Sequence, residues 1–200
     1  MSTAGLLLAA GAGRRMGTPK GLLRDERQVP FLDRMLGNLF QGGCEPVTVV
    51  LGASSDEATA LLAEAGWADD PAVEVVVCSD WAEGMGASLR AGLHCLVASA
   101  SGRAADSALV MLVDLPDVGP AVLTRVIAAG AGEHSLVRAT YAGTSGHPVL
   151  LGRAHWAGLL ESVSGDRGAR DYLSGRPVLE VECGDLATGA DVDRPEDLRR

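Results

Sequence analysis

The chain has 200 residues, 47% of them hydrophobic and 22% charged. This composition excludes a disordered tail, a collagen-like repeat and a coiled coil, and the length is that of one ordinary domain. Aromatic residues make up 4% of the chain and the net charge is −9. Nucleic acid is therefore not expected as a partner, because stacking side chains are scarce and the charge repels polyanions. We predict a single domain over residues 1–200.

The cysteines and the apolar segments bear on where the protein resides. The four cysteines lie far apart and lack the close pairs of zinc sites and thioredoxin-like motifs, so we expect reduced, buried thiols. Residues 1–13 are apolar but lack the basic beginning of a signal peptide. No apolar run approaches the length of about 18 residues that a membrane span needs. We predict a cytoplasmic protein without a membrane partner.

Short apolar runs alternate with helical periodicity along the chain, which is typical of a parallel α/β sheet. The strands are expected at residues 4–10, 46–51, 73–78, 108–113 and 135–140, with further candidates at 147–152 and 177–183. Apolar side chains at helical spacing predict four helices in the following stretches: Phe31 to Phe40, Leu89 to Val97, Val122 to Ile127 and Trp156 to Val163. In such sheets ligands bind at the carboxyl ends of the strands, so the loops after the strands carry the functional signal.

The loop after the first apolar run is rich in glycine and carries basic side chains. Residues 8–20 read LAAGAGRRMGTPK, and such a turn exposes several backbone N–H groups toward one point, as phosphate binding requires. The dinucleotide fingerprint does not match, because the glycines are spaced GxGxxxG, one residue too long, and the Walker spacing also fails. The alternative is a glycine-rich strand-to-helix turn with solvated arginines.

This run resembles the signature of the MobA-like nucleotidyltransferases, and especially of the molybdenum cofactor cytidylyltransferase branch. The resemblance implies a single-domain, mostly parallel, Rossmann-like three-layer sandwich of the nucleotide-diphospho-sugar transferase type. It also implies a nucleotide-binding loop made of Leu8, Ala9, Ala10, Gly11, Ala12, Gly13, Arg14, Arg15, Met16, Gly17 and Lys20. Arg15 and Lys20 would contact the phosphates. Because an LAAG turn accompanies cytidine in this family, Ala10 favours CTP.

Two aspartates are candidate ligands of a Mg²⁺ ion. Asp114 ends an apolar run in an Asp-Leu-Pro sequence that is similar to the family's Asp-Met-Pro, and a carboxylate at a strand end suits Mg²⁺. The alternative is an aspartate that only starts a turn. Near the C-terminus, alignment of Val192 with the family pattern selects Asp193 over Asp191 as the second ligand. A competing interpretation makes Asp193 a helix cap in a capping box with Glu196.

Three further segments resemble the family's base and acceptor motifs. Gly86 and Ser88 correspond to the turn that meets the base and ribose, whereas Ser88 is alternatively a helix N-cap. The expected acceptor-binding residues are Gly146, His147, Pro148, Asp166 and Gly168. His147 is alternatively a hydrogen-bonded structural histidine. Trp81 and Trp156 are expected to pack against the core.

The resemblance spans residues 6–198 and departs from the family pattern at residues 24–30, which are unusually charged. It implies attack by an acceptor phosphate on the α-phosphorus of a nucleoside triphosphate, with Arg15, Lys20 and Asp114 as the catalytic residues. The expected acceptor is a phosphorylated pterin, molybdopterin or molybdenum cofactor, and the expected protein partner is a molybdoenzyme or its maturation chaperone. The alternatives are the same chemistry with GTP or a sugar phosphate, and a non-catalytic chaperone that holds the cofactor.

Overall fold

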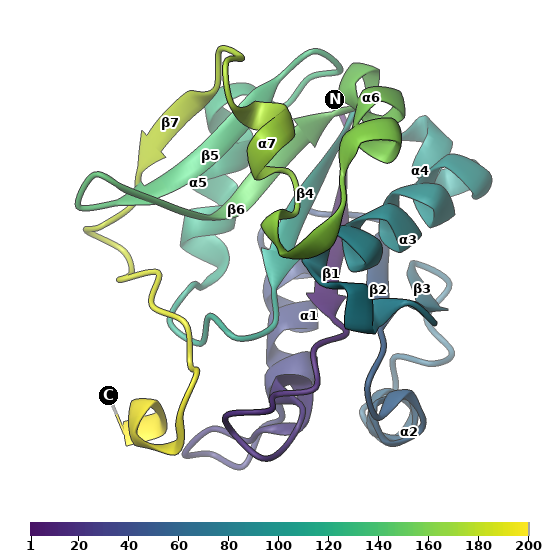
Figure 1. The fold of residues 1–200 in the computed structure, drawn as a ribbon, viewed down its shortest axis with the longest axis vertical. Helices are drawn as coiled ribbons and strands as arrows, with labels where there is room; N and C mark the ends of the chain where they lie inside the picture. The colour runs from purple at the N-terminus through teal and green to yellow at the C-terminus, as the bar shows by residue number, and fades with distance from the viewer. Residues whose placement is uncertain (200) are drawn as a thin grey trace.

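A seven-stranded sheet runs through the middle of the protein in the computed structural model, which describes residues 1–199 (Figure 1). The strands are β1 Thr3–Ala9, β2 Val47–Leu51, β3 Val73–Val77, β4 Ser107–Leu112, β5 Leu136–Tyr141, β6 Thr144–Gly152 and β7 Leu179–Glu182. The helices are α1 Phe31–Gln41, α2 Ser55–Glu64, α3 Met85–Ala98, α4 Ala100–Ala104, α5 Pro120–Gly130, α6 Trp156–Ser162 and α7 Arg170–Leu173.

The sheet is mostly parallel, as the sequence predicts. Its order is β3-β2-β1-β4-β6-β5-β7, and β6 alone among these strands runs antiparallel to its neighbours β4 and β5. All of the apolar runs expected as strands form strands, although β6 begins at Thr144 rather than at His147. The tight turn between β5 and β6 explains the antiparallel pairing, because a two-residue connection cannot return the chain to a parallel position.

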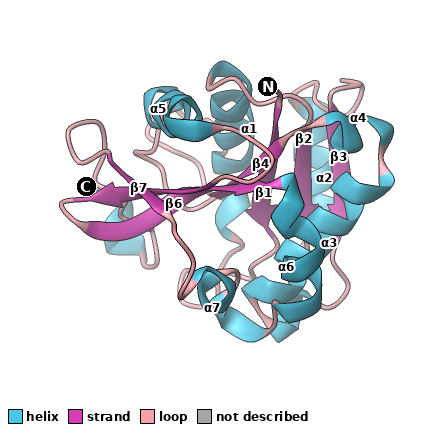
Figure 2. Ribbon diagram, turned by 90° about the horizontal axis from the view of Figure 1, so that it is seen from above, coloured by secondary structure: helices cyan, strands magenta, loops and turns pink. Residues whose placement is uncertain are grey.

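Helices cover both faces of the sheet and produce three layers (Figure 2). On β1, Leu7 and Ala9 pack into the cluster that contains the buried side chains of α1, α2 and α5. Leu6 and Leu8 point to the opposite face, where they pack against α3, α6 and α7. Since successive side chains of a strand alternate between faces, both layers require apolar residues, and this explains the unbroken apolar run of β1. The predicted three-layer α/β sandwich is confirmed.

The predicted helical stripes are largely buried. Phe31, Met35, Leu36 and Leu39 of α1 are at most 2% exposed. In α3 the buried stripe is narrower than expected, because Val97 is 43% exposed. Within residues 1–199, no helix combines the length and the apolar character needed to cross a membrane.

The C-terminal segment after β7 brings distant parts of the chain together. It crosses to the carboxyl ends of β1 and β4, where the amide of Val192 donates a hydrogen bond of 2.9 Å to the carbonyl of Asp114. In Figure 1 this yellow segment descends toward the purple loop that follows β1. The side chain of Val192 is buried in the same cluster as α1, so its neighbours are held at this edge of the sheet.

Candidate active site

The loop after β1 folds back on itself around Gly13. The carbonyl of Gly13 accepts hydrogen bonds of 2.9 Å from the amides of Met16 and Gly17. Gly13 has a φ of +57°, and a Cβ there would lie 1.9 Å from the carbonyl oxygen of Thr18. Only glycine fits both the backbone conformation and the close approach. The glycine pattern therefore specifies a tight loop and not merely a flexible one.

This loop forms one wall of a cavity of about 600 Å³ at the carboxyl ends of β1 and β4. The cavity is lined by Leu8, Ala10, Gly11, Ala12, Gly13, Arg14, Arg15, Lys20, Trp81, Ala82, Gly84, Met85, Ser88, Leu112, Val113, Asp114, Asp166 and Asp193. The position agrees with the general rule that ligands of open α/β sheets bind beyond the carboxyl ends of the strands.

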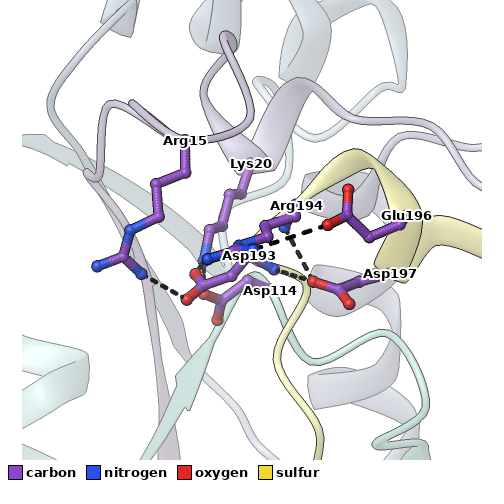
Figure 3. A network of polar contacts seen from close by, with 7 residues as sticks. All are labelled: Arg15, Lys20, Asp114, Asp193, Arg194, Glu196 and Asp197. Carbon is purple, nitrogen blue, oxygen red and sulfur yellow. Dashed lines mark hydrogen bonds and ion pairs between the residues drawn. The ribbon is translucent and has the colours of Figure 1, made fainter.

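Lys20 connects two carboxylates at one end of the cavity (Figure 3). Its Nζ lies 2.7 Å from Oδ2 of Asp114 and 2.5 Å from Oδ1 of Asp193. Arg15 contacts the other oxygen of the second carboxylate, at 2.8 Å from Oδ2 of Asp193. The Lys20 and Asp114 side chains are 17% and 16% exposed, so this contact is less screened by water than a surface ion pair.

The charges in this cluster shift one another's pKa values. Burial by itself would lower the pKa of Lys20, but the negative charges and hydrogen bonds of Asp114 and Asp193 outweigh it, and the pKa is raised. The pKa of Asp193 is lowered, first by its hydrogen bond with Lys20, against the opposing effect of burial. The charged forms of Lys20 and Asp193 are therefore both favoured by their contact.

A third carboxylate, that of Asp191, lies at the same place. One ligand oxygen each of Asp114, Asp191 and Asp193 lies within 4.8 Å of the others. The buried Val192 separates the last two in sequence and anchors them to Asp114 through its amide. Three hard carboxylate oxygens at this spacing are a donor set that fits a divalent cation such as Mg²⁺. The structure thus brings together both aspartates between which the sequence had to choose.

The alternative that pairs Asp193 with Glu196 in a capping box is wrong, because Asp197 and not Glu196 accepts the hydrogen bonds of this turn. Oδ2 of Asp197 accepts hydrogen bonds from the amides of Asp193 and Arg194, at 3.2 and 2.9 Å. Glu196 instead lies 3.8 Å from the guanidinium of Arg194. Asp197 caps the turn before the short 3-10 helix Pro195–Arg199. Because Lys20 and Arg15 contact the carboxylate of Asp193, that side chain lies in the cavity and does not cap this helix.

The far end of the cavity is formed where α3 begins. The helix starts at Met85, and Gly84 is its N-cap, so the alternative that made Ser88 the N-cap is wrong; Ser88 lies in the first turns and lines the cavity. A Cβ on Gly84 would lie 2.2 Å from Oδ1 of Asp166, and one on Gly86 would lie 2.8 Å from the backbone of Ser164. These glycines allow the loop that carries Asp166 to lie directly against α3.

Several predicted site residues do not line the cavity. They are Ala9, Met16, Gly17, Gly86, Gly146, His147, Pro148 and Gly168. Ala9 faces the α1 layer because side chains alternate along β1, and Met16 packs against the same cluster. Gly86 and Gly168 lie next to residues that line the cavity. Gly86 packs against the loop that carries Asp166, and a Cβ on Gly168 would lie 3.0 Å from the sulfur of Met85.

His147 lies on β6 with a partly buried side chain. Burial, and then the positive charge of Arg170, lower the pKa of its imidazole to about 4. Its carbonyl oxygen accepts a hydrogen bond of 2.6 Å from the hydroxyl of Tyr141. The ring is therefore neutral at physiological pH, and its direct contact with an acceptor stays a prediction.

Sequence reasoning missed part of the apolar cavity wall. Trp81, Ala82, Met85, Leu112 and Val113 line the cavity without having been expected there. Trp81 does pack against the buried cluster, as predicted, but its other side faces the cavity. The available signal was position, because Trp81 lies in the connection between β3 and α3 and Met85 is the first residue of α3. Trp156 is 2% exposed, in agreement with its predicted packing role.

The charged segment 24–30 forms a compact turn before α1. The carboxylate of Asp25 accepts hydrogen bonds from the amides of Arg27 and Val29, and Arg34 of α1 lies 3.1 Å from it. Burial by itself would raise the pKa of Asp25, but the two hydrogen bonds and the charge of Arg34 outweigh it, and the pKa is lowered. The departure of this segment from the family pattern thus has a local structural explanation.

Comparison with known proteins identifies relatives over nearly the whole chain. Residues 5–181 match the family model of the MobA-like NTP transferase domain. A nicotine blue oxidoreductase from Paenarthrobacter nicotinovorans is 34% identical, over 98% of this chain and 94% of its own.

Solved structures from Mycobacterium tuberculosis H37Rv share the fold. The crystal structure of Rv0371c is 32% identical with a TM-score of 0.79, and the alignment covers 100% of this chain and 97% of the other. A crystal structure of Rv0371c in complex with manganese is 29% identical with a TM-score of 0.76, over the same shares of the two chains.

Proposed function

Because this chain belongs to the MobA-like NTP transferase family, we propose that it transfers a nucleoside monophosphate from a nucleoside triphosphate to a phosphorylated acceptor and releases pyrophosphate. CTP is the favoured donor and a phosphorylated pterin, molybdopterin or molybdenum cofactor, the favoured acceptor. One observation carries the proposal: Lys20, Asp114 and Asp193 meet at the end of a cavity whose wall is the glycine-rich loop.

The chain's own groups suit phosphoryl chemistry, which depends on positioning and charge neutralisation more than on a protein nucleophile. Residues 11–13, Arg14, Arg15 and Lys20 line the cavity, and their backbone amides and basic side chains would hold the triphosphate. Charge that develops on the leaving pyrophosphate is stabilised by these fixed donors. The attacking phosphate is already ionised at neutral pH, so the acceptor needs no general base.

Asp114 and Asp193, with Asp191 beside them, would hold a divalent cation, and Mg²⁺ is the ion we propose. When bound, such an ion neutralises phosphate charge at the reacting centre. The manganese complex of Rv0371c supports a divalent ion in this family. Lys20 contacts the carboxylates of Asp114 and Asp193, and the hydrogen bond from the Val192 amide to the backbone carbonyl of Asp114 holds the C-terminal segment beside them.

The rest of the cavity would hold the base and the acceptor. Ala10 and Ser88 also line it and are the proposed neighbours of the cytosine and ribose. Asp166, at the far end, is the proposed acceptor contact. Residues 146–148 and Gly168 would act beyond this cavity, on a larger acceptor or on a molybdoenzyme partner. The free thiols of all four cysteines support a reducing, cytoplasmic location.

The test is pyrophosphate release from CTP, GTP, ATP and UTP, each with molybdopterin, molybdenum cofactor and sugar phosphates. We expect release with CTP and the pterin, and its loss in Lys20→Ala and in Asp114→Ala. Asp56→Ala, in the exposed first turn of α2, is the control and should retain activity. Turnover at the wild-type rate in either site variant, with the fold confirmed by circular dichroism, would reject the assigned roles.

A second candidate is an oxidoreductase, favoured by the 34% identity to nicotine blue oxidoreductase over 98% of this chain. Its test mixes the same protein with nicotine blue and either NADH or NADPH, and measures the decrease in absorbance of the reduced nicotinamide. Oxidation of the nicotinamide that depends on the dye, together with no pyrophosphate release from any donor and acceptor, would replace the transferase proposal with this one.

A further inference from the structure

The ammonium of Lys20 occupies the space between the two carboxylates that would hold the divalent cation. Its Nζ lies within 2.7 Å of one oxygen of each, Asp114 Oδ2 and Asp193 Oδ1. Figure 3 shows the lysine reaching between these carboxylates from the loop after β1. A cation placed against the same two oxygens would meet both the volume and the charge of the ammonium.

Each carboxylate oxygen of Asp193 lies beside a positively charged side chain. Oδ1 contacts Lys20, and Oδ2 lies 2.8 Å from Nη1 of Arg15. Of the three clustered carboxylates, that of Asp191 takes part in none of these contacts. The pocket that would bind the metal ion is therefore largely neutralised by the protein's own basic groups.

We propose that Lys20 closes the divalent-cation site in the free protein, and that binding of a nucleotide triphosphate opens it by drawing the ammonium onto the phosphates. This inference rests on the proposed function, because it assumes that the cavity takes a triphosphate. It makes metal and nucleotide binding mutually dependent: either ligand removes part of the obstacle to the other. Such coupling is reciprocal by thermodynamic necessity.

The phosphate side of this exchange is present in the cavity. Residues 11–15 of the loop that carries Lys20 line the same space, so a triphosphate held by their amides and arginines would place anionic oxygens near the lysine. An ammonium on a flexible stem readily moves from carboxylate to phosphate. Once it leaves, Arg15 is the basic side chain still in contact with Asp193, so the three neighbouring carboxylates carry a net negative charge that attracts a divalent ion.

The residue type also supports a cation-like role. Lys20 is the only lysine among the 17 basic residues of the chain. A guanidinium is planar and larger and forms forked hydrogen bonds, whereas an ammonium is a compact point charge comparable with a small hydrated ion. The chain's one lysine therefore stands at the position where a basic group has to fit between two carboxylates.

The first experiment measures Mn²⁺ affinity without nucleotide, by electron paramagnetic resonance of the free ion. We expect Lys20→Met to bind Mn²⁺ more tightly than the wild type by roughly 10-fold or more, within the usual range of coupling between sites. Arg14→Met is the matched control: it removes one positive charge from the same cavity wall, and its affinity should change by less than about 3-fold at moderate salt. Equal affinities of Lys20→Met and either the wild type or Arg14→Met would overturn the proposal.

The second experiment uses the unaltered protein. Lysine labelled with ¹³C at Cε gives one side-chain signal, because the chain has one lysine. We expect this signal to shift with CTP in the presence of a chelator, and to shift with Mg²⁺ along the same concentration curve that calorimetry gives for Mg²⁺ binding. Bound Mg²⁺ with a stationary lysine signal would overturn the proposal.

These measurements involve no turnover, so the two proposals fail separately. A protein that transfers no nucleotide to any acceptor, but whose Lys20→Met variant binds Mn²⁺ more tightly, contradicts the proposed function alone. An active transferase whose Mn²⁺ affinity is unaffected by Lys20→Met contradicts only the exchange at Lys20.

Discussion

The two ends of the cavity are built in different ways. At the phosphate end, charged side chains from three distant parts of the chain, Lys20, Asp114 and Asp193, contact one another directly. At the acceptor end, backbone packs against backbone: the glycines that open α3 contact residues 164–165, and of the predicted acceptor residues Asp166 reaches the cavity. The first end depends on charge and the second on close packing, and substitutions should separate them.

The largest effect is expected at the phosphate end, from Asp193→Asn. Loss of this carboxylate removes the acidic partner of Arg15 and one of the two acidic partners of Lys20, and should lower the rate of pyrophosphate release on the order of 10²- to 10³-fold. Asp191→Asn is the matched comparison, because Asp191 lies in the same cluster without those contacts, and its effect should be smaller, on the order of 10-fold. The ranking would be contradicted if Asp191→Asn were the more damaging change.

At the acceptor end, Gly86→Ala should disturb packing. The added Cβ would lie 2.8 to 2.9 Å from backbone atoms of Ser164 and Gly165, and crowding of this kind costs about 1–3 kcal/mol of unfolding free energy. We expect KM for the acceptor to rise more than KM for CTP, because the loop of Asp166 moves. Urea unfolding and initial rates measure the two effects.

Gly37→Ala in α1 is the control for this change. The nearest atom to its added Cβ is Nε2 of Gln41 at 4.0 Å, so the substitution should stabilise the helix by up to about 1 kcal/mol. A Gly86→Ala protein as stable as Gly37→Ala would show that the contact between α3 and the loop is loose.

His147 should make the acceptor half sensitive to mild acid. The pKa of the folded imidazole is lowered from 6.5 to about 4, first by burial, so between these values the unfolded chain binds a proton that the folded chain does not. The free energy of unfolding should therefore fall as the pH drops from 6.5 to about 4. His147→Asn should flatten this decline in urea titrations, whereas substitution of the exposed His134 should leave it unchanged.

The smallest effect is expected at Glu182, at the end of β7. Hydrogen bonds from the amides of Gly143, Gly184 and Ala142 lower the pKa of this carboxylate from 4.5 to about 2. Its contribution to stability is present in full above pH 4.5 and is lost as the pH falls through 2. Glu182→Gln should lower the melting temperature at pH 7 but lose less on acidification than the wild type. Glu64→Gln, in the last turn of α2, is the control.

Strands were more predictable than helices in this chain. The runs that form β1 and β4 are apolar over several consecutive residues, and central strands buried on both faces produce that pattern directly. The helix α2 was not predicted, since only Ala58, Leu61 and Leu62 of its ten residues are buried. Its apolar signal is too sparse to give a helical period. A helix buried on one narrow face therefore has a weaker apolar pattern in the sequence than a strand buried on both faces.

The sequence by itself determined the chemistry of the glycine-rich loop and the approximate positions of the strands, because both depend on residues that are neighbours in the chain. Only the tertiary structure decided that Lys20 joins Asp114 to Asp193, since the last of these lies 173 residues away. The same holds for the presence of Asp191 in the cluster and for the capping of the final turn by Asp197. Contacts between distant segments depend on strand order and on the path of the C-terminal segment, and short-range patterns carry no information about either.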